Sequence, residues 1–237
     1  MCSGRVDLKH VLRAFENGMD GVFIGGCRLN ECNYTTHGNY HALNVVLLCR
    51  KIMEHLGLNP ERLSVEFMSA GDGILFAEVM SEFGKKVKGL GPLGKAEGLD
   101  GDELRSRLAG VIRLVPYIKV VKQEKLAFRL ENPEAYDDFF TGDEIDRLFR
   151  EVVSYYIDPL KCQACMTCAR RCPAEAIISA RNQVHVIDQD KCLKCGTCFA
   201  VCPSRFGAVR KIAGESVPPP LPEGERTIVG KSDKEVG

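Results

Sequence analysis

The chain has 237 residues, with 32 basic and 32 acidic side chains, so its formal net charge is zero. That balance argues against a protein that binds nucleic acid through bulk positive charge. No apolar run is long enough to cross a bilayer, and the first residues contain no hydrophobic signal-peptide core. We therefore expect a cytoplasmic protein without a membrane span, large enough for one or two domains.

The first ninety residues alternate between helical and strand patterns. Helices are predicted over residues 6–18, 39–57 and 72–89, and strands over residues 21–26 and 63–69. This alternation predicts an α/β domain with a parallel sheet over residues 1–90. Because only two strands are visible, we expect the parallel sheet to be incomplete and to be completed by something else.

Residues 91–152 are predicted to be a linker and helical connector. The segment contains part of a G-x-G-x-x-G pattern at Gly89, Gly91 and Gly94, but a dinucleotide site requires a strand before this motif. Here a helix precedes it, so a plain linker is favoured. A further helix is predicted over residues 141–156, with Thr141 as its cap and Glu144 closing a capping box.

The tail, residues 213–237, is rich in proline and charge. That composition predicts a segment that is either disordered or laid over a partner.

Twelve cysteines are present, and eight of them lie between Cys162 and Cys202. Without a secretory signal, such clustering favours metal binding over disulfides.

The segments "KCQACMTCARRCP" and "KCLKCGTCFAVCP" both read C-x2-C-x2-C-x3-C-P. Three closely spaced thiolates suit three corners of a cubane, and the fourth cysteine serves the other cluster. The pattern predicts two [4Fe-4S] clusters, the first held by Cys162, Cys165, Cys168 and Cys202, the second by Cys192, Cys195, Cys198 and Cys172.

The repeat extends beyond the cysteines, since "YYID" precedes the first copy and "HVID" precedes the second. Residues 153–212 therefore resemble the bacterial two-cluster ferredoxin domain, which has an α+β fold. Zinc is the alternative, but zinc sites favour separated C-x2-C pairs. A ferredoxin unit transfers single electrons and needs no acid, base or nucleophile.

Further cysteines lie upstream. Cys27 and Cys32 form a C-x4-C pair directly after a predicted strand, where functional loops of parallel sheets are common. The spacing matches the first pair of plant-type [2Fe-2S] ligands, and Cys2 is a candidate third ligand. Cys49 is predicted to be a packed core thiol. For His37 and His41, beside Cys32, a polar role at a helix start is favoured over metal binding.

The blocks "CSGRVD", "DGVFIGGCRLNEC", "GNYHA" and "LGLNPERLSVEFMSAGDG" resemble the delta subunit of methyl-viologen-reducing hydrogenase over residues 1–90. The resemblance implies a [2Fe-2S] cluster, with Cys2, Cys27 and Cys32 matching family cysteines. It also implies a link between a hydrogenase or formate dehydrogenase and a heterodisulfide reductase-like flavoprotein. The family usually begins with another strand and a cysteine pair, which this chain lacks ahead of its first block. Either another polypeptide completes the ligand set, or the domain is a docking platform.

These observations together predict an iron–sulfur electron-transfer subunit of a multi-subunit redox complex in an anaerobe. The resemblance implies a neighbouring subunit like the flavin subunit of heterodisulfide reductase, where electron bifurcation would occur. The chain itself is expected to be non-catalytic. Expected partners are a heterodisulfide reductase-like flavoprotein and a hydrogenase, formate dehydrogenase, NADH-oxidising or aromatic-ring reductase module. Two alternatives remain: a catalytic flavin- or NAD-dependent oxidoreductase, and a docking scaffold with a ferredoxin appendage.

Overall fold

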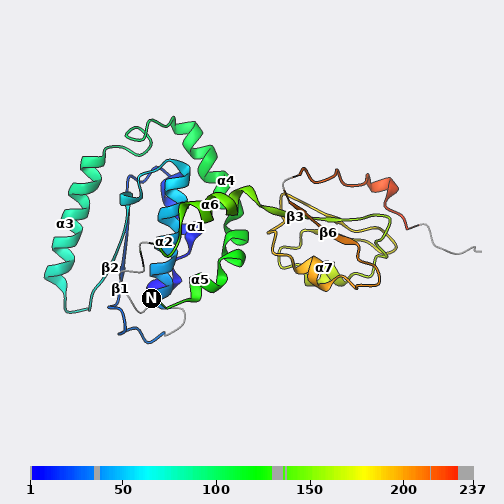
Figure 1. Cartoon of the computed structure of the whole chain (residues 1–237), viewed down its shortest axis with the longest axis horizontal. Coiled ribbons are helices and arrows are strands. Elements are labelled where there is room, and N and C mark those ends of the chain that lie inside the picture. The colour runs from blue at the N-terminus through cyan, green and yellow to red at the C-terminus, as the bar shows by residue number, and fades with distance from the viewer. Residues whose placement is uncertain (1, 35–37, 130–135, 137, 214, 229–237) are drawn as a thin grey trace, which may run out of the picture. The chain divides into compact units, whose positions relative to one another are not determined.

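The computed structural model describes residues 2–34, 38–129, 136, 138–213 and 215–228. Two compact units make up the chain, Met1–Phe149 and Arg150–Gly237 (Figure 1). Residues 91–149, predicted to be linker and helical connector, therefore belong to the first unit. No helix among the described residues is long and apolar enough to cross a membrane.

The first unit contains the predicted parallel sheet. Strand β1 (Val22–Gly26) pairs in parallel with β2 (Leu63–Phe67), in a register that runs from Val22 opposite Leu63 to Gly26 opposite Phe67. Helix α2 (Asn39–Leu56) makes the crossover and ends at Gly57, whose φ of 81° is the left-handed conformation that favours glycine. The predicted parallel pairing of these two strands is confirmed, and the described part of the chain adds no third strand to the sheet.

The core of the first unit lies between helices α1, α2 and α4. Helix α1 (Leu8–Glu16) begins at Asp7, whose carboxylate accepts a hydrogen bond from the Lys9 amide at 2.9 Å. Helix α4 (Gly101–Val121) packs against α1, and the short α5 (Gln123–Ala127) packs against α2. Fully buried side chains in this core include Leu12, Phe15, Val46, Leu48, Ile52, Met53, Leu108 and Ile118.

Helix α3 (Gly73–Leu90) is the exception, because none of its residues is buried. Figure 1 shows α3 on one side of the two strands and α1 and α2 on the other. Phe23 of β1 packs against α3, with its ring centroid 5.6 Å from that of Phe83. Ile74 is nevertheless 81 % exposed and Phe76 49 % exposed. Several apolar side chains of α3 are therefore largely exposed to solvent.

A buried ion pair ties β2 to the turn after α3. The Arg62 side chain is fully buried, and its Nε donates to Glu97 Oε1 at 2.6 Å. Its Nη1 also donates to the carbonyls of Asp20 (3.0 Å) and Gly91 (2.9 Å). The guanidinium thereby satisfies loop carbonyls that no regular element pairs.

The helix predicted over residues 141–156 is shorter in the structure. Helix α6 (Gly142–Arg150) begins after Thr141, whose hydroxyl accepts from the Glu144 amide at 3.3 Å, as predicted. The Glu144 carboxylate, however, pairs with Lys122 and Lys125 and does not close a capping box. Residues 153–157 form a strand, because this β-branched and aromatic run has a strand partner in the second unit.

The second unit contains two short antiparallel sheets. Strand β3 (Val153–Ile157) pairs with β6 (Val209–Ala213), and β4 (Ile177–Ile178) pairs with β5 (Val186–Ile187). Helices α7 (Thr167–Arg171) and α8 (Thr197–Val201) complete the unit and pack against each other. The result is the ferredoxin-type α+β arrangement that the repeat predicts.

The described part of the tail packs on the second unit. Val184 donates its amide to the Arg226 carbonyl at 2.7 Å, and Ile228 donates to the Asn182 carbonyl at 3.0 Å. Gln183 and Thr227 form an isolated antiparallel bridge. The prediction of a disordered or partner-bound tail is therefore wrong for residues 215–228, because these backbone groups pair within the chain itself.

Candidate metal centre

The two cysteine loops have the same backbone conformation. Ala164 and Met166 in the first copy have φ values of 47° and 62°, and Lys194 and Gly196 in the second have 54° and 79°. The threonine at the start of each short helix contacts the middle cysteine: Cys165 Sγ lies 3.4 Å from Thr167 Oγ1. The matching distance from Cys195 Sγ to Thr197 Oγ1 is 3.3 Å. The sequence repeat is thus a structural repeat.

Backbone hydrogen bonds cross between the two copies. The Asp158 amide, ahead of the first copy, donates to the Ala208 carbonyl at 2.7 Å, beyond the end of the second. The Asp188 amide, ahead of the second copy, donates to the Ala176 carbonyl at 2.8 Å, beyond the end of the first. Each copy is therefore closed by the segment that follows the fourth cysteine of the other.

One small cavity gathers cysteines from both copies. Its walls include Cys192, Cys195 and Cys198 of the second copy together with Cys172 of the first. Tyr155 and Ile177 contribute apolar wall. The four thiols are the set predicted for the second cluster.

The cysteines of the first copy differ in burial. Cys162 and Cys168 are buried, whereas Cys165 is exposed. Burial alone would raise the pKa of Cys165, but hydrogen bonds from Thr167 and the charge of Arg205 outweigh it and lower the pKa. Arg205 comes three residues after Cys202, so the end of the second copy lies beside the first copy's thiols. Cys202 itself packs against the buried core of the unit.

Burial governs the protonation of the inner thiols. Burial, together with a smaller effect of neighbouring cysteines, raises the pKa of Cys198 to about 12 and that of Cys168 to about 11. Iron binds the thiolate form, so loading these sites releases protons.

The donor arrangement fits an iron–sulfur cluster better than a single ion. A tetrahedral zinc requires its ligands to converge at about 2.3 Å from one point. Within the described residues, no three His, Cys, Asp or Glu side chains are placed to hold one ion in that way. A cubane instead takes one thiolate at each iron, so its sulfurs surround a cage. Cysteines that line a shared cavity match the second geometry.

A third group of cysteines lies in the first unit. Cys2 Sγ and Cys32 Sγ are 3.9 Å apart. Burial raises the pKa of Cys27, and the neighbouring Cys32 and Cys2 thiols raise it further. Backbone N–H groups of Tyr34 and Asn39 lower the pKa of Cys32. The structure therefore brings together the three upstream cysteines singled out in the sequence.

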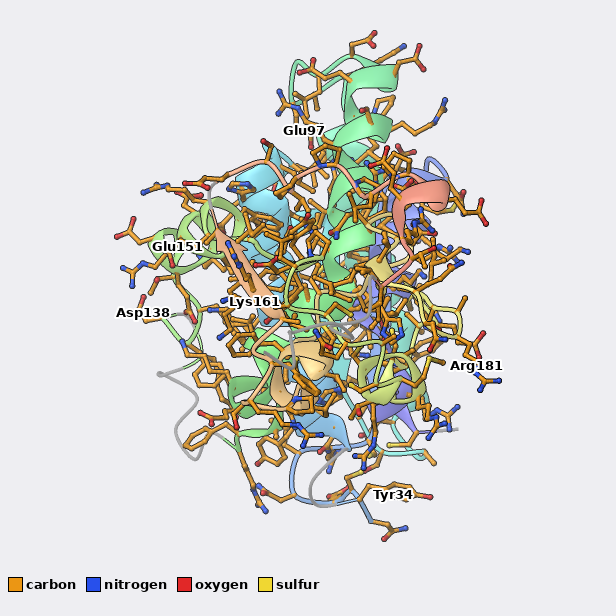
Figure 2. All side chains as sticks on the ribbon, turned by 90° about the vertical axis from the view of Figure 1, so that its right-hand side faces the viewer. Tyr34, Glu97, Asp138, Glu151, Lys161 and Arg181 are labelled. Carbon is orange, nitrogen blue, oxygen red and sulfur yellow. The ribbon has the colours of Figure 1, made fainter. Side chains whose placement is uncertain are left out.

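The loops around this trio are fixed by one buried amide. Asn39 Nδ2 donates to the carbonyls of Cys27 (2.9 Å) and Arg28 (2.6 Å), at the end of β1. Beyond Cys32 the side chain of Tyr34 points outward and is 64 % exposed (Figure 2). The trio thus lies near the surface of the first unit.

Other residues singled out in the sequence have structural roles. Cys49 is completely buried in α2, and burial raises its pKa to about 12, as expected of a core thiol. His41 Nδ1 lies 3.0 Å from the Leu126 carbonyl, which agrees with a polar role at a helix start. His37 lies outside the described residues. Gly91 and Gly94 lie in turns after α3, so the glycine motif is a connector.

The sequence assigned no role at the metal centre to His185, which the structure places there. His185 is 1 % exposed, and its Nδ1 lies 3.4 Å from Cys168 Sγ. Its backbone N–H points at Cys162 Sγ at 3.5 Å. The signal in the sequence was the alignment of "HVID" with "YYID", which places His185 where the first copy has Tyr155.

Comparisons with known proteins match both units. The family described as methyl-viologen-reducing hydrogenase, delta subunit, matches residues 1–91, and a 4Fe-4S dicluster domain matches residues 154–203. An iron-sulfur subunit of the F420-non-reducing hydrogenase vhu of Methanopyrus kandleri is 37 % identical over 92 residues, which cover 39 % of this chain and 69 % of that protein. The chain belongs to the methyl-viologen-reducing hydrogenase delta subunit family.

Two further relatives match this chain over segments of similar length. An F420-non-reducing hydrogenase iron-sulfur subunit of Archaeoglobus profundus is 46 % identical over 91 residues, covering 38 % of this chain and 66 % of the relative. A subunit of the Ferredoxin/F(420)H(2)-dependent CoB-CoM heterodisulfide reductase of Methanosarcina acetivorans is 39 % identical over 94 residues. That match covers 40 % of this chain but only 12 % of the reductase protein, so the chain spans less than two thirds of either relative. Each of these matches therefore accounts for about two fifths of this chain.

Proposed function

We propose that this chain is an iron–sulfur electron-transfer subunit of a cytoplasmic redox complex in an anaerobe. The observation that carries the proposal is the cavity in which Cys172 of one copy joins three cysteines of the other. The 4Fe-4S dicluster match covers the same region. The proposed ligands are Cys162, Cys165, Cys168 and Cys202 for the first cluster, and Cys192, Cys195, Cys198 and Cys172 for the second.

Each cluster, when bound, accepts and releases one electron at a time. The residues of the chain position it and control its surroundings. Ile177, Ile187 and Val209 form part of the buried core that packs around the cysteines and limits the access of water. Backbone N–H groups that point at sulfur, such as those of Lys194 at Cys192 (3.4 Å) and Ala176 at Cys172 (3.3 Å), stabilise thiolate charge.

The N-terminal unit is proposed to dock on a neighbouring subunit. The Met68 amide donates to the Gly26 carbonyl at 2.8 Å. In β2, every second residue counted from Met68 therefore points its backbone N–H and C=O groups toward β1. Val65 and Phe67 then turn their backbone groups toward an edge that no other described strand covers. A groove of about 560 Å³ follows this edge between α2 and α3. An extended segment of a partner would complete the sheet and cover α3.

The names of the relatives suggest which partner this is. They are called subunits of hydrogenases and of heterodisulfide reductases. We therefore favour a heterodisulfide reductase-like flavoprotein as the neighbour and the site of electron bifurcation. A hydrogenase, formate dehydrogenase, NADH-oxidising or aromatic-ring reductase module would supply or receive electrons elsewhere in the complex.

The trio of Cys2, Cys27 and Cys32 is proposed as part of a [2Fe-2S] site. Such a cluster takes four ligands, and the only other cysteine of the first 149 residues, Cys49, is buried in the α2 core. The trio alone therefore does not fit the group. The fourth ligand would come from the partner, or the unit serves only as a docking platform.

A catalytic flavin- or NAD-dependent oxidoreductase is less well supported. It requires a loop that cradles phosphate between a strand and a helix. The glycines that match such a pattern follow α3 and have no strand before them.

The test is anaerobic purification of the full chain, with iron, zinc and flavin analysis and EPR spectroscopy. We expect about eight irons per chain and two reduced [4Fe-4S] signals. A colourless protein that holds zinc, or flavin absorption without added partners, would contradict the proposal.

A further inference from the structure

Resting on the proposed first cluster, we propose that His185 donates a hydrogen bond from Nδ1–H to Cys168 Sγ and thereby raises the reduction potential of that cluster. The chain would then contain two clusters with unequal potentials, although their cysteine loops have the same conformation.

The contact is direct and buried. His185 Nδ1 lies 3.4 Å from Cys168 Sγ, within hydrogen-bonding range of sulfur, and the residue is 1 % exposed. The His185 backbone N–H lies 3.5 Å from Cys162 Sγ, so one residue faces two proposed ligands of the same cluster. A cysteine that binds iron has no proton to give. The ring nitrogen must therefore be the donor.

The other side of the ring is shielded from water. Nε2 has no hydrogen-bond partner among the described residues. The tail lies beside this site, because His185, Val217, Pro218 and Leu221 line the same small cavity. The proton on Nδ1 is directed at the Cys168 sulfur, and this geometry does not depend on the state of Nε2.

The ring at the matching position of the second site is a phenol and not an imidazole. Tyr155 occupies the matching position of the repeat, and its hydroxyl faces the Gly196 backbone: a Cβ added at Gly196 would lie 2.7 Å from that oxygen. Tyr155 also lines the cavity of the second cluster. The two sites thus differ by an imidazole N–H at one and a phenol at the other.

Reduction adds negative charge that spreads onto the ligand sulfurs. A hydrogen bond to a thiolate stabilises the reduced form more than the oxidised form, which raises the potential. The effect is strengthened in a buried site, where the local dielectric constant is low. An electron that enters the chain is therefore held preferentially at the cluster beside His185, relative to the same site without the donor.

The test uses an isosteric pair of variants in the full chain. His185→Asn keeps an N–H at nearly the same distance from Cβ, whereas His185→Leu has a similar size and no donor. Potentials are measured by EPR-monitored redox titration after iron analysis. We expect the Leu variant to retain about eight irons, with the first potential shifted downward and the second unchanged. The Asn variant should restore most of the shift, and Tyr155→Phe should leave the first potential unaltered.

The inference would be overturned if the His185→Leu variant keeps all its iron and the reduction potential of its first cluster is unchanged. Equal shifts in the reduction potentials of both clusters would overturn it as well. A second measurement covers the case in which the variants lose iron. In wild-type protein with 15N-labelled histidine, pulsed EPR of the reduced first cluster should show coupling to a histidine nitrogen, and its absence would also overturn the inference. Wild-type protein without two [4Fe-4S] signals would instead refute the proposed function itself.

Discussion

Cys165 is the exposed thiol of the first copy, whereas Cys162 and Cys168 are buried. Its exposure favours cluster binding over side-chain packing as the reason for the cysteine spacing. An exposed thiol contributes little to a hydrophobic core, yet the loop holds it in place through left-handed residues on either side of it, Ala164 and Met166. Such backbone conformations are uncommon outside glycine and persist where a site requires them.

Cys165→Ala is expected to lower the iron content from about eight to about four per chain. It should also lower the melting temperature of the second unit, because cluster binding and folding are coupled. Iron analysis and anaerobic thermal unfolding measure both effects. Cys49→Ala is the matched control and should keep all its iron, since Cys49 lies in the core of the other unit. Full iron in Cys165→Ala would show that the ligand assignment is wrong.

Gly196 is predicted to be intolerant of a side chain. Its φ is 79°, and an added Cβ would lie 2.7 Å from the Tyr155 hydroxyl. Gly196→Ala should destabilise the protein by about 1–3 kcal/mol in denaturant unfolding of the loaded protein. Left-handed φ alone is not decisive, because Met166 has a side chain at the equivalent position of the first copy.

The double variant Gly196→Ala with Tyr155→Phe separates strain from contact. Removing the hydroxyl leaves the ring carbon at 3.3 Å as the nearest atom, so most of the lost stability should return. No recovery in the double variant would mean that backbone strain, and not the Tyr155 contact, requires glycine here.

At the scale of whole elements, sequence patterns predicted some features of the fold and missed others for identifiable reasons. The parallel β1–β2 pair and α2 follow from apolar periodicity and the glycine at residue 57, and both are confirmed. The predicted helix over residues 141–156 failed because residues 153–157 find their partner in β6, some fifty residues later in the chain. Local periodicity does not contain such a distant pairing. For the same reason, it did not reveal that α3 buries none of its residues.

The tail is an element whose contribution can be measured by deletion. Its backbone bonds from Val184 to Arg226 and from Ile228 to Asn182 cover the side of the unit that contains His185. Deleting residues 214–237 should lower the free energy of unfolding by about 1–3 kcal/mol, the sum of two such bonds. Anaerobic denaturant titration of the iron-loaded protein checks this, and unchanged stability would show that the tail contacts carry no net energy.

The Arg62–Glu97 pair predicts a pH dependence of the first unit. Burial alone would raise the pKa of Glu97, but hydrogen bonds from Arg62 outweigh it and lower the pKa below its ordinary value of 4.5. A carboxylate with a lowered folded-state pKa stabilises the fold above its unfolded pKa. That contribution is lost as the pH falls through the folded value. Unfolding measured from about pH 6 down to about pH 3 should therefore show a loss of stability.

Glu97→Gln removes the titrating group and provides the control. It should cost about 3–5 kcal/mol near neutral pH, because a fully buried guanidinium loses its counter-charge. Its stability should then depend less on pH than that of wild type over the acid range. A wild-type-like acid transition in this variant would assign the pH effect to other carboxylates.

At the scale of the whole molecule, the two sets of cysteines differ in how complete they are. The second unit contains eight cysteines in two copies that hydrogen-bond to each other. The crossing of the fourth cysteines is a prediction that the sequence repeat makes, and the cavity that joins Cys172 to the second copy supports it for one of the two clusters. The part played by His185 was not predictable, since the repeat shows which residue differs but not which atom it faces. In the first unit, the structure brings three thiols together at the end of β1.

This difference predicts that iron content depends on assembly. The isolated chain should hold about eight irons, and the native complex should contribute about two more at the trio if a partner supplies the missing ligand. Mössbauer and EPR spectra of the isolated chain and of the complex measure the difference. Cys32→Ala should abolish the additional signal only in the complex, while the ferredoxin clusters remain in both. A [2Fe-2S] signal in the isolated chain would show that the trio completes its site without a partner. An iron content that does not rise on assembly would mean that the first unit is a docking platform only.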